Sequence, residues 1–303
     1  MNKIVILLVS ISGILSSQNN DILKVDINNL QFDVRSAGLS NKGDAVILLH
    51  GFPETSHMYS DLISLLSSNG YKVIAPDQRG YSHGARPDSK KEYLIKYLVE
   101  DIFLMADHFG FEKFHLVGHD WGASVGWVAS KNKPERIITW TALSVPHLDA
   151  FSDALKSDDD QKKKSRYFKF FKIPFIPEYY FSLNNNKNLK NVWNKSSDEQ
   201  INEYLKVFSD KNALKGSLNW YRANIGTNNS SIKHLGNINT ATQFIWGNKD
   251  MALGRKGAEL TKNYMTGEYK FVELDAGHWL IQEDYNKISS TILNFINDHR
   301  EIK

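Results

Sequence analysis

The sequence predicts an α/β fold in which helices cover a mostly parallel sheet and a helical segment is inserted after the sixth strand. Short apolar runs recur without polar alternation, as expected for strands that are buried on both faces of a parallel sheet. Amphipathic helical patterns lie between these runs. With 303 residues, of which 41% are hydrophobic, the chain is long enough for one core and an inserted subdomain.

The strands follow from the apolar runs in chain order. Residues 22–34 alternate loosely and are expected to form two short strands. The runs that predict the remaining strands are residues 45–49, 71–75, 114–117, 137–143, 244–246 and 271–274. The helical patterns include residues 58–68, 94–109 and 123–131. This alternation of strand and helix is typical of a doubly wound sheet.

A change in composition after Pro146 marks the insertion. Residues 149–235 are rich in Lys, Asn, Asp and aromatic residues and contain no run typical of a buried strand. We therefore expect residues 21–148 to form the first part of the core, residues 149–235 a helical cap, and residues 236–303 the second part of the core.

The first 20 residues are typical of a secretory signal peptide. Lys3 supplies a positive charge, residues 4–15 are almost wholly apolar, and the small polar stretch Ser16-Ser17-Gln18 follows where a cleavage site would lie. The apolar stretch is shorter than the ~20 residues that a membrane span needs. We expect a secreted or periplasmic protein with no stable membrane span after signal removal. An uncleaved anchor is the alternative.

Composition excludes several classes of function. The formal net charge of +3 is close to balance and gives no reason to expect a nucleic-acid partner. The chain has no Cys, which excludes disulfides and thiolate chemistry. The histidines are scattered without metal-ligand spacing, and no Gly-rich phosphate loop follows a strand. We therefore expect neither a metal nor a cofactor.

The motif Gly118-His119-Asp120-Trp121-Gly122 lies between a predicted strand and a predicted helix. This is the context of a nucleophile elbow, in which flanking glycines let backbone approach backbone in a tight turn. The central residue, Asp120, is a carboxylate that is ionised at neutral pH because its reference pKa is about 3.9. It can displace a leaving group from saturated carbon without a base and form an alkyl ester. Asp120 is therefore the candidate nucleophile.

Cleavage of such an ester needs a base, and two residues late in the chain suit that role. His278 follows the last predicted strand, and Asp250 follows the strand before it. Both are expected at the carboxyl edge of the sheet, where a carboxylate can orient a histidine that activates water. Hydrolases whose nucleophile lies on such a turn between strand and helix have the same chain order of nucleophile, acid and histidine.

An anion hole is predicted from His50-Gly51-Phe52-Pro53, which follows the strand at residues 45–49. The backbone N–H groups of Phe52 and Trp121 are the candidates to bind the oxyanion of ester hydrolysis. We expect the Phe52–Pro53 bond to be cis, which would aim the Phe52 N–H inward. His50 is expected to be a structural hydrogen-bonding residue.

Together these motifs resemble the epoxide hydrolase family of the α/β-hydrolase superfamily, over nearly the whole chain after the signal. The stretch Asp77-Gln78-Arg79-Gly80-Tyr81 is similar to the family's loop after the fourth strand. The resemblance implies the α/β-hydrolase fold. It also implies a small hydrophobic epoxide and water as substrates, with a vicinal diol as product and no cofactor.

The resemblance further implies two cap tyrosines that hydrogen-bond the epoxide oxygen. Leu218-Asn219-Trp220-Tyr221-Arg222 looks like the segment that bears one of them, and Arg166-Tyr167-Phe168-Lys169-Phe170-Phe171 is similar to the other. Tyr221 and Tyr167 are thereby the candidates. A phenol with a pKa near ~10 can protonate a strained ether oxygen without being ionised itself.

Two alternatives remain at this point. A haloalkane dehalogenase would use the same triad, with the Trp121 indole N–H as one halide donor. Many dehalogenases have Asn at the position of Phe52 as the second donor, and a cap residue such as Trp193 would have to replace it here. A non-catalytic binding protein of the same fold would not need the complete triad. A serine esterase is excluded unless another Ser is the nucleophile, because Asp120 occupies the elbow.

Overall fold

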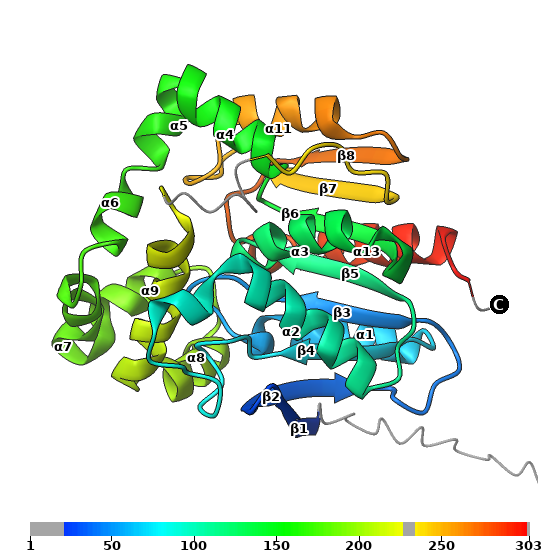
Figure 1. Cartoon of the computed structure of the whole chain (residues 1–303), viewed down its shortest axis with the longest axis horizontal. Coiled ribbons are helices and arrows are strands. Elements are labelled where there is room, and N and C mark those ends of the chain that lie inside the picture. Colours follow the sequence, from blue (N-terminus) through cyan, green and yellow to red (C-terminus); the bar gives the residue numbers. More distant parts are fainter. Residues whose placement is uncertain (1–20, 227–233, 302–303) are drawn as a thin grey trace, which may run out of the picture.

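The computed structural model describes residues 21–226 and 234–301, which contain an eight-stranded sheet (Figure 1). The strands are β1 (Asp21–Ile27), β2 (Leu30–Ala37), β3 (Ala45–Leu49), β4 (Lys72–Pro76), β5 (Phe114–His119), β6 (Ile137–Leu143), β7 (Thr242–Gly247) and β8 (Tyr269–Leu274). Their order is β1-β2-β4-β3-β5-β6-β7-β8, in which β2 pairs antiparallel with β1 and β4 and all other pairs are parallel. The prediction of a mostly parallel sheet is confirmed. The predicted signal peptide, residues 1–20, lies outside the described residues.

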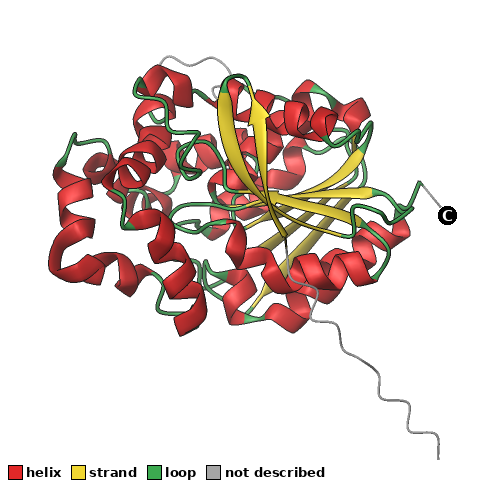
Figure 2. Cartoon of the chain, turned by 90° about the horizontal axis from the view of Figure 1, so that it is seen from below, coloured by secondary structure: helices red, strands yellow, loops and turns green. Residues whose placement is uncertain are grey.

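Helices cover both faces of the sheet (Figure 2). The helix α1 (Ser60–Ser68) packs against α13 (Tyr285–Asp298), and α2 (Ile95–His108) packs against α3 (Trp121–Asn132). The short helices α11 (Arg255–Leu260) and α12 (Leu280–Glu283) follow β7 and β8. Because β3, β5 and β7 are enclosed on both faces, every residue in them is buried. This burial explains the apolar runs from which these strands were predicted.

The described chain between β6 and β7 is mostly helical and forms a cap after the sixth strand, as predicted. Its helices are α4 (Leu148–Ser157), α5 (Asp159–Lys164), α6 (Tyr167–Phe171), α7 (Ile176–Val192), α8 (Asp198–Phe208) and α9 (Lys211–Asn224). Helices α6 to α9 lie beyond the end of the sheet at which β7 ends, on the left in Figure 1. The carboxylate of Asp149 accepts the N–H groups of Leu235 and Gly236 at 3.0 and 2.8 Å and so joins the two ends of this segment. No helix of the described residues is long and apolar enough to cross a membrane.

The loop after β4 connects the core to the cap. The Arg79 guanidinium donates two hydrogen bonds to the Asp101 carboxylate at 2.8 and 2.7 Å, and both side chains are buried. The Arg79 carbonyl accepts the indole N–H of Trp220, in α9, at 2.8 Å. The loop singled out in the sequence therefore holds α9, and with it Tyr221, against the core.

Candidate active site

Asp120 occupies a strained turn between β5 and α3. Its φ of 50° and ψ of −118° lie outside the regions that bulky residues favour. A Cβ on Gly118 would lie 2.5 Å from the Gly122 carbonyl oxygen, and one on Gly122 would lie 2.2 Å from the Leu49 carbonyl oxygen. Both glycines are therefore required by the close approach of backbone segments, as the motif predicts. The turn lifts the Asp120 side chain out of the sheet and toward the cap.

The structure brings His278 and Asp250 to Asp120. The Nδ1 atom of His278 lies 2.9 Å from Oδ2 of Asp250, and its Nε2 lies 3.7 Å from Oδ2 of Asp120. The other oxygen of Asp250 accepts the backbone N–H groups of Ala252 and Leu253 at 2.7 and 3.0 Å, which fixes the carboxylate. The His278 ring is thus held by one carboxylate and faces the other. All three side chains are buried.

The three side chains shift one another's ionisation. Burial alone lowers the pKa of His278, but the charges and hydrogen bonds of Asp250 and Asp120 outweigh it and raise that pKa well above its usual value. Burial raises the pKa of Asp120, but the nearby His278, with smaller contributions from His119 and the Phe52 N–H, brings that pKa below its usual value. These shifts favour the anionic form of Asp120 and the cationic form of His278.

The predicted anion-hole residues lie at the same carboxylate. The Phe52 N–H donates to Oδ1 of Asp120 at 2.8 Å, and the Phe52–Pro53 bond is cis. Trp121 is the first residue of α3, where backbone N–H groups have no partner within the helix. His50 is fully buried. Its Nε2 accepts the backbone N–H of Gln78 at 3.1 Å and its Nδ1 lies 3.0 Å from the Gly51 carbonyl oxygen, which suits a structural residue.

Both candidate tyrosines face the nucleophile from the cap. Tyr221 comes from α9 and Tyr167 begins α6, and their ring centroids lie 6.2 Å apart. Burial, followed by the charge of Asp120, raises the pKa of both phenols well above the usual value. Both phenols therefore stay protonated and can donate. Tyr179 and Tyr180, which follow closely in sequence, are exposed on α7 instead.

A two-lobed cavity surrounds these side chains. The first lobe has a volume of about 260 Å³ and is walled by apolar residues that include Leu148, Phe151 and Leu155. The second has about 270 Å³ and is walled mainly by aromatic and aliphatic side chains. Three residues line both lobes: Asp120, Tyr167 and Tyr221. The nucleophile and the two phenols therefore lie where the lobes meet, and apolar groups can extend from them in two directions.

Glu54 and His119 form a buried pair of ionisable side chains, not identified from the sequence, that contacts the backbone of His278. Glu54 is fully buried, and its Oε1 accepts from the Tyr204 hydroxyl at 3.2 Å and from the Gln282 amide at 2.5 Å. Its Oε2 lies 3.3 Å from Nδ1 of His119, and Nε2 of His119 lies 2.9 Å from the His278 carbonyl oxygen. The pair therefore supports the backbone that carries His278. Glu54 follows Phe52-Pro53 directly, but nothing in the sequence distinguishes it from a surface glutamate.

Within residues 21–226 and 234–301, no group of three His, Asp or Glu side chains is arranged to hold a metal ion. The ionisable residues that gather at the cavity are a carboxylate–histidine–carboxylate set and two phenols. This arrangement offers a nucleophile, a base and proton donors from side chains alone.

The strand order and the elbow define an α/β hydrolase, and a family model described as alpha/beta hydrolase fold matches residues 44–285. Human Epoxide hydrolase 4 is 31% identical, over 93% of this chain and 80% of that protein. The AB hydrolase superfamily protein YfhM of Bacillus subtilis is 32% identical, over 90% of this chain and 97% of that protein. The structure of Bacillus megaterium epoxide hydrolase in complex with an inhibitor is 25% identical, with a TM-score of 0.82 over 91% of this chain and 100% of that one. The chain belongs to the epoxide hydrolase family of the α/β-hydrolase superfamily.

Proposed function

We propose that this protein hydrolyses epoxides to vicinal diols through an alkyl ester of Asp120. The observation that carries the proposal is the position of Asp120, which faces a histidine–carboxylate pair on one side and two protonated phenols on the other. Membership of the family and the names of the relatives support the same activity.

In the first step Oδ2 of Asp120 forms a bond to an epoxide carbon. The epoxide C–O bond breaks, and the oxygen takes a proton from Tyr221 or Tyr167. Oδ1 stays on the Phe52 N–H, 2.8 Å away, so Oδ2 is the oxygen that is free to attack. The carboxylate needs no base in this step because it is already ionised.

Because the ester removes the charge of Asp120, His278 first loses its proton to solvent, and it regains one when Asp120 ionises again at the end of the cycle. In the second step the neutral His278 takes a proton from water, which attacks Cγ of the ester. Negative charge develops on Oδ1, where the Phe52 N–H, together with that of Trp121, stabilises it. The Cγ–Oδ2 bond then breaks, the diol leaves with the proton from His278, and the Asp120 acid group ionises and restores the phenol through water. Asp250 holds the Nδ1 side of the ring so that Nε2 faces the ester.

Replacing His278 with Gln is the direct test. The variant should still form the ester but not hydrolyse it, so intact-protein mass spectrometry should show an increase equal to the mass of the epoxide. The added mass should map to the peptide with Asp120. A second variant, Tyr221→Phe, should slow ester formation by about 10²–10⁴-fold and leave ester hydrolysis unchanged. Absence of any adduct with reactive epoxides would contradict the proposal.

The contacts of Trp193 argue against the haloalkane dehalogenase alternative, in which this residue would be the second halide donor. The indole N–H of Trp193 donates to the Pro53 carbonyl at 2.9 Å, and the side chain is buried away from both lobes. Assay of the protein on styrene oxide and on a bromoalkane, with diol and bromide measured in parallel, separates the two activities.

We also propose that residues 1–20 direct the protein out of the cytoplasm, as their order of charged, apolar and small polar residues predicts. N-terminal sequencing of the protein from its native host tests this proposal. A mature chain that begins near Asn19 would support it, and a chain that retains Met1 in the cytoplasm would contradict it.

A further inference from the structure

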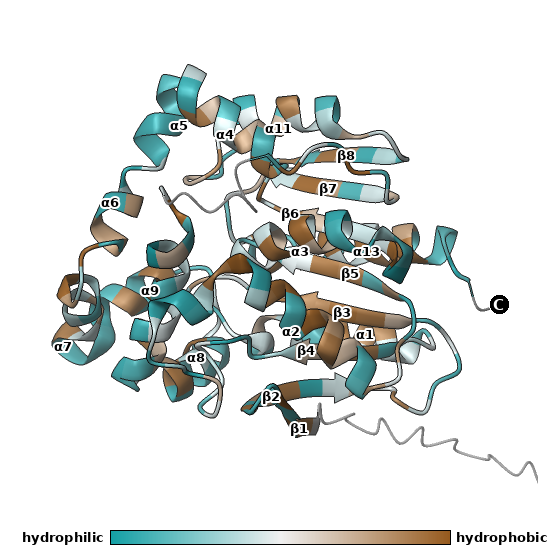
Figure 3. Cartoon of the chain, viewed as in Figure 1, coloured by the Kyte–Doolittle hydropathy of each residue, from teal (hydrophilic) through white to brown (hydrophobic). Residues whose placement is uncertain are grey.

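An apolar segment is exposed where α6 joins α7. More than half of the large hydrophobic side chains exposed in the described residues belong to it: Ile173, Phe175, Ile176, Tyr179 and Tyr180. Phe175 is 79% exposed and has a φ of 65°, a left-handed conformation that bulky residues rarely adopt. The segment lies at the outer edge of the cap, with hydrophobic colouring in Figure 3. Soluble proteins seldom gather exposed apolar residues in this way unless the surface binds something.

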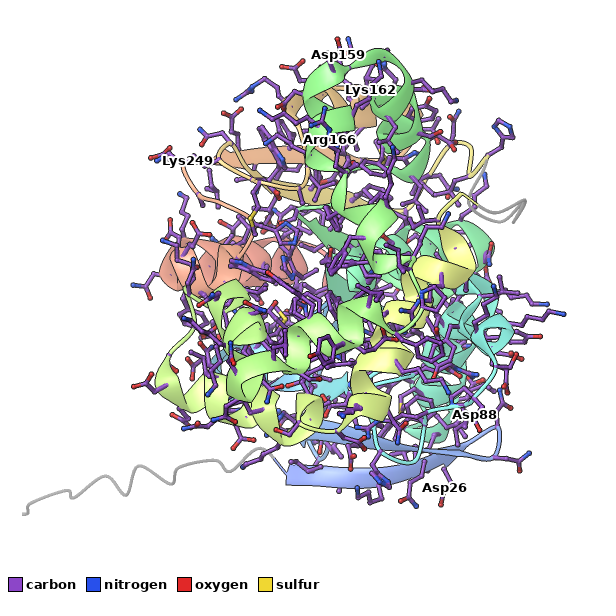
Figure 4. All side chains as sticks on the ribbon, turned by 90° about the vertical axis from the view of Figure 1, so that its left-hand side faces the viewer. Asp26, Asp88, Asp159, Lys162, Arg166 and Lys249 are labelled. Carbon is purple, nitrogen blue, oxygen red and sulfur yellow. The ribbon has the colours of Figure 1, made fainter. Side chains whose placement is uncertain are left out.

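Basic residues flank this apolar segment along the chain. Between positions 165 and 197 the chain has one acidic residue, Glu178, and its carboxylate is paired with Arg222 at 2.6 Å. The exposed basic side chains of the same stretch are Arg166, Lys169, Lys172, Lys187 and Lys195. None of them forms an ion pair with another described residue. Figure 4, which views the molecule from the side of the cap, labels Arg166 near Lys162. The chain on both sides of the apolar segment therefore carries exposed positive charge.

The apolar segment continues into the wall of the active-site cavity. Ring centroids of Tyr180 and Phe181 lie 5.4 Å apart, those of Phe181 and Phe171 lie 5.8 Å apart, and those of Phe171 and Tyr221 lie 4.9 Å apart. Phe171 and Phe181 line the second lobe, and so does the exposed Met251. A chain of aromatic rings thus leads from the exposed surface to a phenol that faces Asp120.

We propose that this surface docks the protein peripherally on an anionic lipid bilayer, and that a lipophilic epoxide passes from the bilayer along the aromatic wall to Asp120. Aromatic and aliphatic side chains insert at the boundary of headgroups and acyl chains. Lysine and arginine side chains around them bind anionic headgroups. This part of the cap carries both features, and its flanking basic residues, which form no ion pair within the described chain, favour lipid over a second copy of this chain, which would bring the same charges. The delivery of substrate rests on the proposed function, whereas the docking does not.

Vesicle co-sedimentation of the full chain tests the docking. The fraction bound to phosphatidylcholine vesicles should rise when phosphatidylserine is added and fall again at high salt. The variant F175S/I176S/Y179S should lower the partition coefficient by at least about tenfold on both kinds of vesicle. The variant K169E/K172E/K187E should remove only the increase caused by phosphatidylserine. All variants are prepared with the same N-terminus as the parent, so differences between them report on this surface.

Matched controls alter exposed residues elsewhere. I22S/L39S removes two exposed hydrophobic side chains of the core, and K256E/K262E reverses two lysines near α11. Both should bind vesicles as the parent does. A thermal unfolding midpoint equal to that of the parent would show that a variant is folded. Vesicle binding by F175S/I176S/Y179S at the level of the parent would overturn the proposal. A self-association that this variant abolishes, without any vesicle binding by the parent, would overturn it in favour of a second copy.

Catalysis provides a separate readout. F175S/I176S/Y179S should hydrolyse water-soluble styrene oxide at the parental rate and a vesicle-dissolved lipophilic epoxide at least about tenfold more slowly. Equal rates on the vesicle-dissolved epoxide would overturn substrate delivery. Vesicle binding by a parent protein that hydrolyses no epoxide would refute the proposed function and leave the docking standing.

Discussion

Gly51→Ala should displace the nucleophile without changing any group that takes part in the chemistry. A Cβ at this position would lie 2.3 Å from Cβ of Asp120 and 2.6 Å from its Oδ1. Carbon atoms in contact normally stay about 3.5–4.0 Å apart, so one of the two segments must move by at least about 1 Å. A misplacement of about 1 Å at a reacting group can cost ~10²-fold in rate. We therefore expect ester formation to slow by about 10²-fold.

Single-turnover mass spectrometry in the His278→Gln background measures this rate directly, because the ester persists there. The crowding should also lower the free energy of unfolding by about 1–3 kcal/mol, which urea denaturation checks. Gly254→Ala is the matched control, since its nearest neighbours are side-chain oxygens of Asp160 and Gln161 at 3.2 Å. Ester formation at the parental rate in a folded Gly51→Ala protein would refute the idea that the close contact between Gly51 and Asp120 positions the carboxylate.

Three further predictions concern charge, stability and substrate shape. Because the pKa of His278 is raised in the folded protein, its stabilising contribution is present below the unfolded pKa and is lost as the pH rises through the folded pKa. Asp250→Asn should flatten this pH dependence of the thermal midpoint. Asp101→Ala leaves the buried Arg79 guanidinium without its partner and should cost about 3–5 kcal/mol in urea denaturation, with Asp101→Asn as the milder control. Leu155→Trp narrows the first lobe and should lower kcat/KM by ~10-fold or more for epoxides with apolar groups on both carbons, with a smaller loss for styrene oxide.

The fold was predictable where burial leaves a pattern in the sequence. Strand β3 is enclosed on both faces, so its residues are uniformly apolar and the run stands out. Local breaks were not predictable. The predicted helix at residues 58–68 begins as the 3-10 turn Ser56–Tyr59, and α7 is interrupted by left-handed residues at 184–186. These breaks depend on tertiary contacts and on backbone conformations that a local sequence pattern does not predict.

The triad was predictable because its members each follow a strand, and parallel strands end at one edge of the sheet. The pairing of Glu54 with His119 was not, because it depends on residues far apart in the chain, such as Gln282. The two lobes of the active-site cavity could not be predicted from the sequence either. Their walls come from the core and from several cap helices, and only the folded arrangement shows that both lobes meet at Asp120.

The geometry also explains how one imidazole can serve both proposed steps. In the free protein His278 lies between two carboxylates, which together raise its pKa and favour its protonated form. The charge of His278 in turn lowers the pKa of Asp120 and favours the ionised form that can attack. Ester formation turns Asp120 into a neutral group and removes one of the two charges that raise the pKa of His278. The pKa of the imidazole should therefore fall when the ester forms, which is when a neutral base is needed. On this mechanism the rate of ester hydrolysis rises with pH, whereas the rate of ester formation stays level across the same range. Equal pH profiles for the two steps would show that the charges of Asp120 and His278 are not coupled in this way.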